Sequence, residues 1–318
     1  MKTVALSSIG DMKLNFNKST VDLNDVLAVK HMLENVGIKV NLFNTDNTEI
    51  AYKADILFLK CGVIVNWGGQ QTENLKSLID LVNNFDGPVF MMSVDQDFVF
   101  PNSEREGFKS IVRPVYFLYS GEDHKEQALK QMKGFEIADS FQFYQGVQIG
   151  KDLISEPFLN VIPQYDAIYG GQARKELLKT LELISRKYSL VTYAGIRKKL
   201  DKSIHLPVNF NFDSKELRVV NSLGKHSFLF YKPKTPWLTP RIFEQLDSNS
   251  MVLFDTRWKA TELFWTDKNT FSSQDELMDL MEYEPTEKDI KEQHKLSLAF
   301  DYDKYNEEQI SHIIQLLE

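Results

Sequence analysis

The sequence has a single cysteine, Cys61, among its 318 residues. One cysteine excludes an internal disulfide and a cysteine-cluster metal site, and it fits a reducing cytoplasm. Cys61 follows the apolar residues 56–59, so we expect a buried structural thiol rather than a nucleophile. The sequence therefore points away from thiol chemistry.

The chain also lacks long apolar runs. No segment approaches the roughly 18 uninterrupted apolar residues of a membrane span. The opening MKTVALSSIG is too short in its apolar part for a secretory signal. We therefore expect a soluble protein that has no membrane partner and stays in the cytoplasm.

Positive charge is in short supply, because 37 basic residues face 45 acidic ones and leave a net charge of −8. This balance argues against a protein whose whole surface binds nucleic acid. A local basic cleft stays open, since basic residues gather at Arg186–Lys187 and Arg197–Lys199. Such short runs are more often solvated helix ends or loops.

The most informative stretch is Tyr165–Gly195. An apolar run meets Gly170-Gly171, a segment with helical apolar spacing follows, and a second apolar run covers Leu190–Tyr193. This order predicts a strand, a tight turn, a helix and a strand. The helix would aim unpaired N–H groups over the turn, with Arg174 in its first turn, which suits a phosphate. Chain reversal alone explains two glycines about equally well.

The first half of the chain shows the same pattern. An apolar strand at Thr3–Ser7 runs into Gly10, and a helix from about Asp22 to Val36 precedes a strand at Lys39–Phe43. A β-Gly-α-β order belongs to a doubly wound sheet, in which ligands bind beyond the carboxyl ends of the strands. Gly10 is therefore a site candidate.

Two loops of the first half carry further candidates. The strand Asp55–Leu59 leads to Asn66-Trp67-Gly68, which suits either a lid over the core edge or a flat surface beside a ligand. The strand Pro88–Ser93 is followed by Asp95 and Asp97, at the place of a general base in this architecture. Each aspartate is also an ordinary turn former or helix cap.

A helix in the second half carries Arg241 and Glu244 three residues apart. The glutamate can receive the paired hydroxyls of a ribose while the arginine faces phosphate. The commoner interpretation is an intrahelical ion pair of little energetic value.

We divide the chain into residues 1–158, residues 159–300 and a C-terminal helix, 301–318, that packs back on a lobe. The chain is then a bilobed α/β enzyme with a central cleft.

Several of these segments, in this order, resemble the DNA β-glucosyltransferases of T-even phages. The resemblance covers most of the chain and implies the GT-B fold, in which two Rossmann-like lobes with parallel sheets flank a cleft. It also implies inverting transfer of a sugar, glucose or a similar one, from a UDP-sugar to the hydroxymethyl group of a modified pyrimidine in duplex phage DNA. We expect a monomer in the host cytoplasm.

The resemblance implies roles for the matched positions. Asp95 falls on the family's catalytic base. The positions implied to bind the nucleotide sugar are Gly10, Gly170, Gly171, Gln172, Arg174, Arg241 and Glu244. The positions implied to lie on the acceptor side are Asp25, Asn66, Trp67, Gly68 and Asp97.

Two departures keep other functions open. Leu178 stands where the family has a second arginine, and Asp97 stands where it has a basic residue. A GT-B transferase with a non-DNA acceptor and a non-catalytic nucleotide-binding protein therefore remain as alternatives. Residues 94–97 have the letters of an Asp-x-Asp metal motif but fit the base loop better, so we leave a divalent metal open and predict none.

Overall fold

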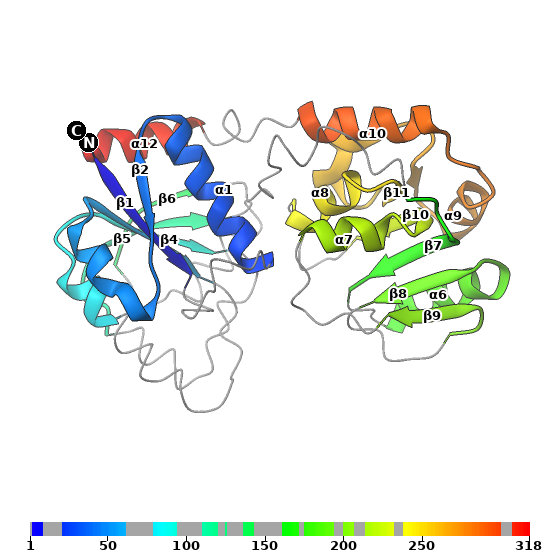
Figure 1. The fold of residues 1–318 in the computed structure, drawn as a ribbon, viewed down its shortest axis with the longest axis horizontal. Helices are drawn as coiled ribbons and strands as arrows, with labels where there is room; N and C mark the ends of the chain where they lie inside the picture. Colours follow the sequence, from blue (N-terminus) through cyan, green and yellow to red (C-terminus); the bar gives the residue numbers. More distant parts are fainter. Residues whose placement is uncertain are drawn as a thin grey trace. The chain divides into compact units, whose positions relative to one another are not determined.

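The computed structural model of the chain describes residues 2–8, 21–61, 79–93, 110–119, 125, 136–142, 161–171, 175–193, 200–206, 214–231, 238–299 and 307–318. The chain divides into two compact units (Figure 1). Unit 1 comprises Met1–Lys18, Asp22–Gln148 and Asp301–Glu318, and unit 2 comprises Ser19–Val21 and Ile149–Phe300. In the described residues each unit contains a six-stranded sheet, and the strand pairs are parallel. This confirms the predicted architecture of two parallel α/β sheets.

Unit 1 has the strand order β2-β1-β3-β4-β5-β6. Its elements are β1 (Thr3–Ser8), α1 (Val21–Asn35), β2 (Lys39–Leu42), the 3₁₀ segment η1 (Thr45–Lys53), β3 (Ile56–Cys61), β4 (Val89–Ser93), β5 (Val115–Tyr119), β6 (Ile137–Gln142) and α12 (Glu307–Leu317). Residues 79–84 are also helical.

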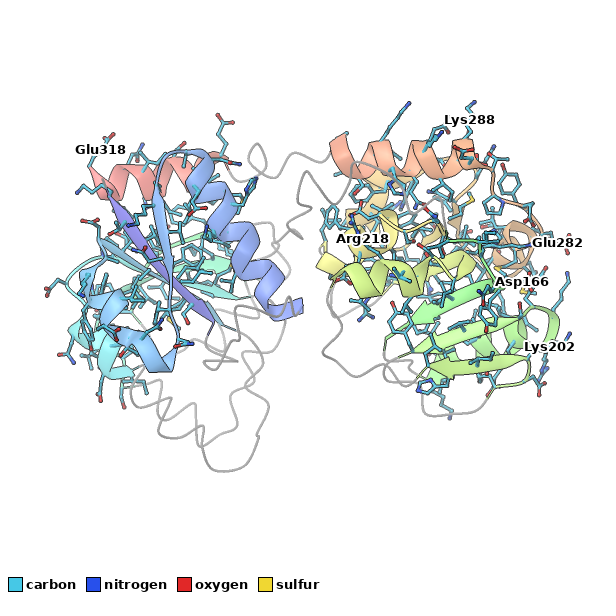
Figure 2. The ribbon with its side chains drawn as sticks, viewed as in Figure 1. Asp166, Lys202, Arg218, Glu282, Lys288 and Glu318 are labelled. Carbon is cyan, nitrogen blue, oxygen red and sulfur yellow. The ribbon has the colours of Figure 1, made fainter. Side chains whose placement is uncertain are left out.

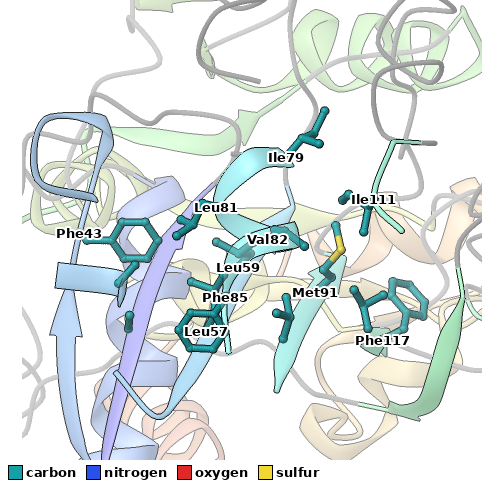
Figure 3. Close-up of a cluster of buried hydrophobic side chains, with 14 of the residues drawn as sticks. Phe43, Leu57, Leu59, Ile79, Leu81, Val82, Phe85, Met91, Ile111 and Phe117 are labelled. Atoms are coloured by element: carbon teal, nitrogen blue, oxygen red, sulfur yellow. The ribbon is translucent and has the colours of Figure 1, made fainter. Parts of the chain in front are cut away.

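The sheet of unit 1 buries apolar side chains on both faces. Successive strand residues point to opposite faces, so Leu57 and Leu59 belong to one cluster while Ile56 and Phe58 belong to the other. Figure 3 shows the first cluster, and side chains of α1 and α12 complete the second. Burial on both faces explains why β3 reads as a continuous apolar run. The C-terminal helix α12 therefore packs on unit 1.

Unit 2 has the strand order β12-β11-β10-β7-β8-β9. Its elements are β7 (Tyr165–Gly170), α6 (Lys175–Lys187), β8 (Leu190–Tyr193), β9 (Ser203–Leu206), α7 (Ser214–Asn221), β10 (Gly224–Leu229), α8 (Pro240–Leu246), β11 (Met251–Asp255), η2 (Lys259–Phe264), β12 (Thr270–Phe271), α9 (Gln274–Leu280) and α10 (Glu287–Ala299). No helix in the described ranges has the length and apolar character needed to cross a bilayer.

The structure differs from the sequence-based expectation at two edge strands, β6 and β9. The apolar and aromatic residues of the segment Phe141–Tyr144 predict a short strand there, whereas β6 begins at Ile137, and no sequence pattern predicts β9. Both strands lie at the end of a sheet. An edge strand has a neighbour on one side only, so partly exposed residues of mixed polarity are tolerated there and the apolar pattern is weak.

The register of unit 2 aligns the ends of three neighbouring strands. Ser227 of β10 pairs with Ile168 of β7 and with Val252 of β11. Two residues later, Gly170 of β7 is therefore level with Phe254 of β11. Since these strands are parallel, the segments that follow them start from one edge of the sheet, where ligands bind in such folds.

A buried ion pair joins the helices on one side of unit 2. Arg218 of α7 donates from Nη2 to Oδ2 of Asp247, at the end of α8, over 2.6 Å. Both side chains are at most 5% exposed. Ser297 of α10 donates to the other carboxylate oxygen over 3.1 Å. Three helices thus share one carboxylate.

We predict that Asp247→Ala destabilises the protein strongly. The substitution leaves the buried guanidinium of Arg218 without its carboxylate, which costs about 3–5 kcal/mol in comparable buried pairs. Urea unfolding measures the loss.

The matched control is Glu282→Ala, which breaks the ion pair between Lys187 and Glu282. Both side chains of that pair are more than half exposed, and Glu282 lies at the surface of unit 2 (Figure 2). Solvent-exposed pairs contribute little, so we expect no measurable change. Equal losses in the two variants would contradict the role assigned to Asp247.

Candidate functional site

The candidate site is the turn that follows β7. The strand ends at Gly170. The next residue, Gly171, has a φ of +123°, a backbone angle that residues other than glycine rarely adopt. The N–H of Gly171 donates to the carbonyl of Tyr193, at the end of the neighbouring strand β8, over 3.2 Å. Helix α6 starts at Lys175. The strand, glycine turn, helix and strand predicted from the sequence are all present.

Neither glycine of the turn has room for a side chain. A Cβ atom on Gly170 would overlap the phenol ring of Tyr193. A Cβ atom on Gly171 would overlap the guanidinium of Arg241. Gly170 is therefore required by the buried ring of Tyr193. Gly171 is required by its φ of +123°, and a side chain there would also displace the guanidinium of Arg241.

The side chain of Tyr193 packs against Gly170 of the turn. It is buried, and its hydroxyl donates to Oδ1 of Asn221 on α7 over 2.8 Å. Burial raises the pKa of Tyr193 to about 12, against the opposing effect of the Arg241 charge. The phenol thus stays protonated at neutral pH. Tyr193 and Asn221 were not among the site residues expected from the sequence; the available signal was a tyrosine at the end of β8, the strand that pairs with β7.

Arg241 reaches the turn from α8. Its Nη1 donates to the carbonyl oxygen of Gly170 over 2.8 Å. A guanidinium has five N–H donors, so this bond leaves others for an anion lying on the turn. Burial raises the pKa of Tyr169, and the positive charge of Arg241 partly opposes this rise.

Glu244 lies one helical turn after Arg241 on α8. Its side chain is only 6% exposed, so Glu244 is more buried than the members of an ordinary surface ion pair. Its negative charge contributes to raising the pKa of Tyr193, so it lies in the same electrostatic neighbourhood as the turn. The described part of the site therefore combines a glycine turn, one cation and one buried carboxylate.

Neither a protein-family model nor a curated protein matches the sequence. Solved structures do match. A mutant of T4 phage BGT in complex with UDP-glucose has a TM-score of 0.73 and 14% identity, over 99% of each chain. The DNA-modifying enzyme β-glucosyltransferase has a TM-score of 0.70 and 13% identity, over 100% of this chain and 99% of that one.

An α-glucosyltransferase in complex with UDP and a DNA that contains an HMU base also matches, with a TM-score of 0.69 and 12% identity, over 98% of this chain and 100% of that one. The chain has the GT-B fold. This confirms the fold class that the sequence resemblance implied.

Within the GT-B fold, the predicted site residues separate into two groups. The structure brings Gly170, Gly171 and Arg241 into contact, with Glu244 on the same helix as Arg241. Asp25 lies in α1. The remaining candidates lie outside the described residues: Gly10, Asn66, Trp67, Gly68, Asp95, Asp97, Gln172 and Arg174.

Leu178 of α6 packs against the apolar core cluster of unit 2, so that position supplies no charge. In the described ranges, no group of three or more His, Cys, Asp and Glu side chains is placed to hold a metal ion.

We predict that Tyr193→Phe destabilises the protein by about 1–3 kcal/mol at neutral pH, because the buried amide oxygen of Asn221 loses its donor. The effect depends on pH. The raised pKa means that the unfolded tyrosine ionises near pH 10, while the folded one stays protonated to about 12. The stability that Tyr193 contributes is therefore full below pH 10 and is lost between pH 10 and 12.

Urea unfolding of the wild type and Tyr193→Phe across pH 7–12 tests this. The difference between the two proteins should shrink as the pH rises above 10. A difference that stays constant to pH 12 would show that the phenol is not held protonated by its surroundings.

Proposed function

We propose that this protein is an inverting glycosyltransferase that moves a sugar, glucose or a similar one, from a UDP-sugar to the hydroxymethyl group of a modified pyrimidine in phage DNA. The observation that carries the proposal is the contact of Arg241 with the Gly170–Gly171 turn, one helical turn from the buried Glu244. This arrangement lies in a fold shared with structures described as complexes with UDP-glucose or with UDP and DNA.

The turn suits the diphosphate of the donor. Transfer breaks the bond between the anomeric carbon and the β-phosphate oxygen, so negative charge accumulates on the departing UDP. Fixed N–H donors and cations stabilise such charge best when they need no rearrangement. Arg241 is already held at the turn by its bond to Gly170. In the proposal, Gly10, Gln172 and Arg174 complete the nucleotide-sugar site.

Glu244 would accept hydrogen bonds from the two ribose hydroxyls. A carboxylate has two oxygens that can each accept from one hydroxyl. Its position three residues after Arg241 places both side chains on one face of α8. Helix α8 would thus bind both the diphosphate and the ribose of one nucleotide.

Asp95 would be the general base. It would take the proton of the acceptor hydroxyl as the hydroxyl oxygen bonds to the anomeric carbon and UDP leaves from the opposite side, which inverts that carbon. In the proposal, Asp25, Asn66, Trp67, Gly68 and Asp97 lie on the acceptor side. A phage enzyme of this kind would work in the cytoplasm of the host cell.

A second candidate is a GT-B transferase with an acceptor other than DNA. The net charge of −8 favours it, because proteins that bind DNA usually draw on a basic surface. The donor chemistry would be the same, and only the acceptor distinguishes the two.

We predict that the protein releases UDP when it is given a UDP-sugar and duplex DNA containing hydroxymethylated pyrimidines. Asp95→Asn should bind UDP like the wild type and transfer at least about 100-fold more slowly, because it lacks a base. Turnover with a panel of UDP-sugars is measured as UDP release, with unmodified duplex as the control.

Turnover with a small molecule or glycan instead of DNA would select the second candidate. UDP binding without turnover on any acceptor would indicate a non-catalytic nucleotide-binding protein. An Asp95→Asn variant that keeps most of the rate would remove Asp95 from the role of base.

We also predict that Gly171→Ala weakens UDP binding by about tenfold or more, because its Cβ displaces the guanidinium of Arg241 from the turn. The matched control is Gly37→Ala. Gly37 has a φ of +83° but no atom near the added Cβ, so it shares the backbone strain without the displacement. Calorimetric titration with UDP should show a loss for Gly171→Ala alone, and equal affinities in the two variants would contradict the role of the turn.

A further inference from the structure

A second guanidinium is fixed at the same edge of unit 2. Strand β11 ends at Asp255, whose side chain is 1% exposed. Its carboxylate accepts from Nε of Arg257 over 2.9 Å and from Nη2 over 2.5 Å. It also accepts from the backbone N–H groups of Arg257 and Tyr231, over 3.1 and 3.3 Å. The buried carboxylate therefore ties the end of β11 to the segment after β10 and orients the guanidinium.

The fixed guanidinium remains accessible. The Arg257 side chain is 67% exposed. Asp255 takes two of the five guanidinium N–H donors, at Nε and Nη2, and leaves three. A guanidinium held on one side by a carboxylate, with donors left on the other, is pre-organised to bind an anion.

The register places Asp255, which holds Arg257, at the level of the glycine turn. Gly170 is level with Phe254, so Gly171 and Asp255 start from the same level of the sheet. They are separated by two strand spacings, about 10 Å. Arg241 of α8 donates to the end of β7, and Arg257 is held at the end of β11. The two guanidiniums therefore interact with the ends of the strands on either side of β10.

The charges around Arg257 support the same placement. The carboxylate of Glu176, in the first turn of α6, is among the groups that raise the pKa of Arg257, after the dominant bond to Asp255. Helix α6 begins shortly after the glycine turn. An anion on the turn would meet the negative charge of Glu176 there, and Arg257 offsets that charge.

We propose that Arg257 is a further cation for the diphosphate of the nucleotide sugar and binds it together with Arg241. This rests on the proposed function, because it assigns a further residue to the same donor. An anion with two phosphoryl groups matches two guanidiniums on either side of one strand end. The ordinary alternative is a local ion pair that only closes the turn at residues 255–257.

The test compares the binding of UDP and of uridine by calorimetric titration. Arg257→Ala should weaken UDP binding by about tenfold or more and leave uridine binding unchanged, because only UDP carries phosphates. Arg257→Lys, which keeps the charge without the planar fork, should recover part of the loss. A pair that only closes the turn predicts that UDP binding either stays unchanged or falls together with uridine binding.

The matched control is Lys268→Ala. Lys268 is also a half-exposed cation of unit 2 paired with a carboxylate, Asp289, over 2.9 Å. It precedes β12 and so lies toward the amino ends of the parallel strands, away from the turn. Its loss should leave UDP binding unchanged. Equal weakening in Lys268→Ala and Arg257→Ala would show a general charge effect and overturn the proposal.

The outcomes separate this inference from the proposed function. A wild type that does not bind UDP contradicts the proposed function itself. A wild type that binds UDP, with an Arg257→Ala variant of the same affinity, contradicts only the role of Arg257. Should Arg257→Ala unfold, Arg257→Gln decides, because its amide can still donate to Asp255 while the charge is gone; UDP affinity equal to the wild type would overturn the proposal.

Discussion

The described site depends on the close approach of two side chains to a turn, which its two glycines permit. Tyr193 lies against Gly170 from within the sheet, and Arg241 lies against Gly171 from α8. Any side chain at either glycine would push one of these groups away. The guanidinium of Arg241 is held at the turn by its hydrogen bond to the carbonyl of Gly170. Such pre-organisation is what makes a charged donor effective toward an anion.

The rest of unit 2 keeps α8 where this contact needs it. Asp247 at the end of α8 is bonded to Arg218 and Ser297, from α7 and α10. Gln293 of α10 donates to the carbonyl of Leu246 over 3.1 Å. These polar groups are buried, so each must be paired at a defined geometry, which restricts how the helices can slide. The buried network and the glycine turn therefore fix the two ends of the same short helix.

Much of the fold was predictable from the sequence because both sheets are buried on both faces. Strands such as β3 and β4 then appear as short apolar runs, and Gly170-Gly171 marks the end of β7. The contact between Arg241 and Gly170, 71 residues apart, was not predictable, since no local pattern encodes it. Tyr193 was missed for the same reason: as part of an apolar run it looks like core, and its role comes from the neighbouring strand.

The charge of the whole chain is a poor guide to its ligand. A net charge of −8 suggests that the protein repels anions. Electrostatic interactions between exposed charges are screened within about 10 Å at ordinary salt, so a phosphate at the turn responds mainly to the groups next to it. There, Arg241 is fixed by a backbone carbonyl and Arg257 by a buried carboxylate. Local geometry at the carboxyl edge of the sheet, and not the charge total, decides what unit 2 can bind.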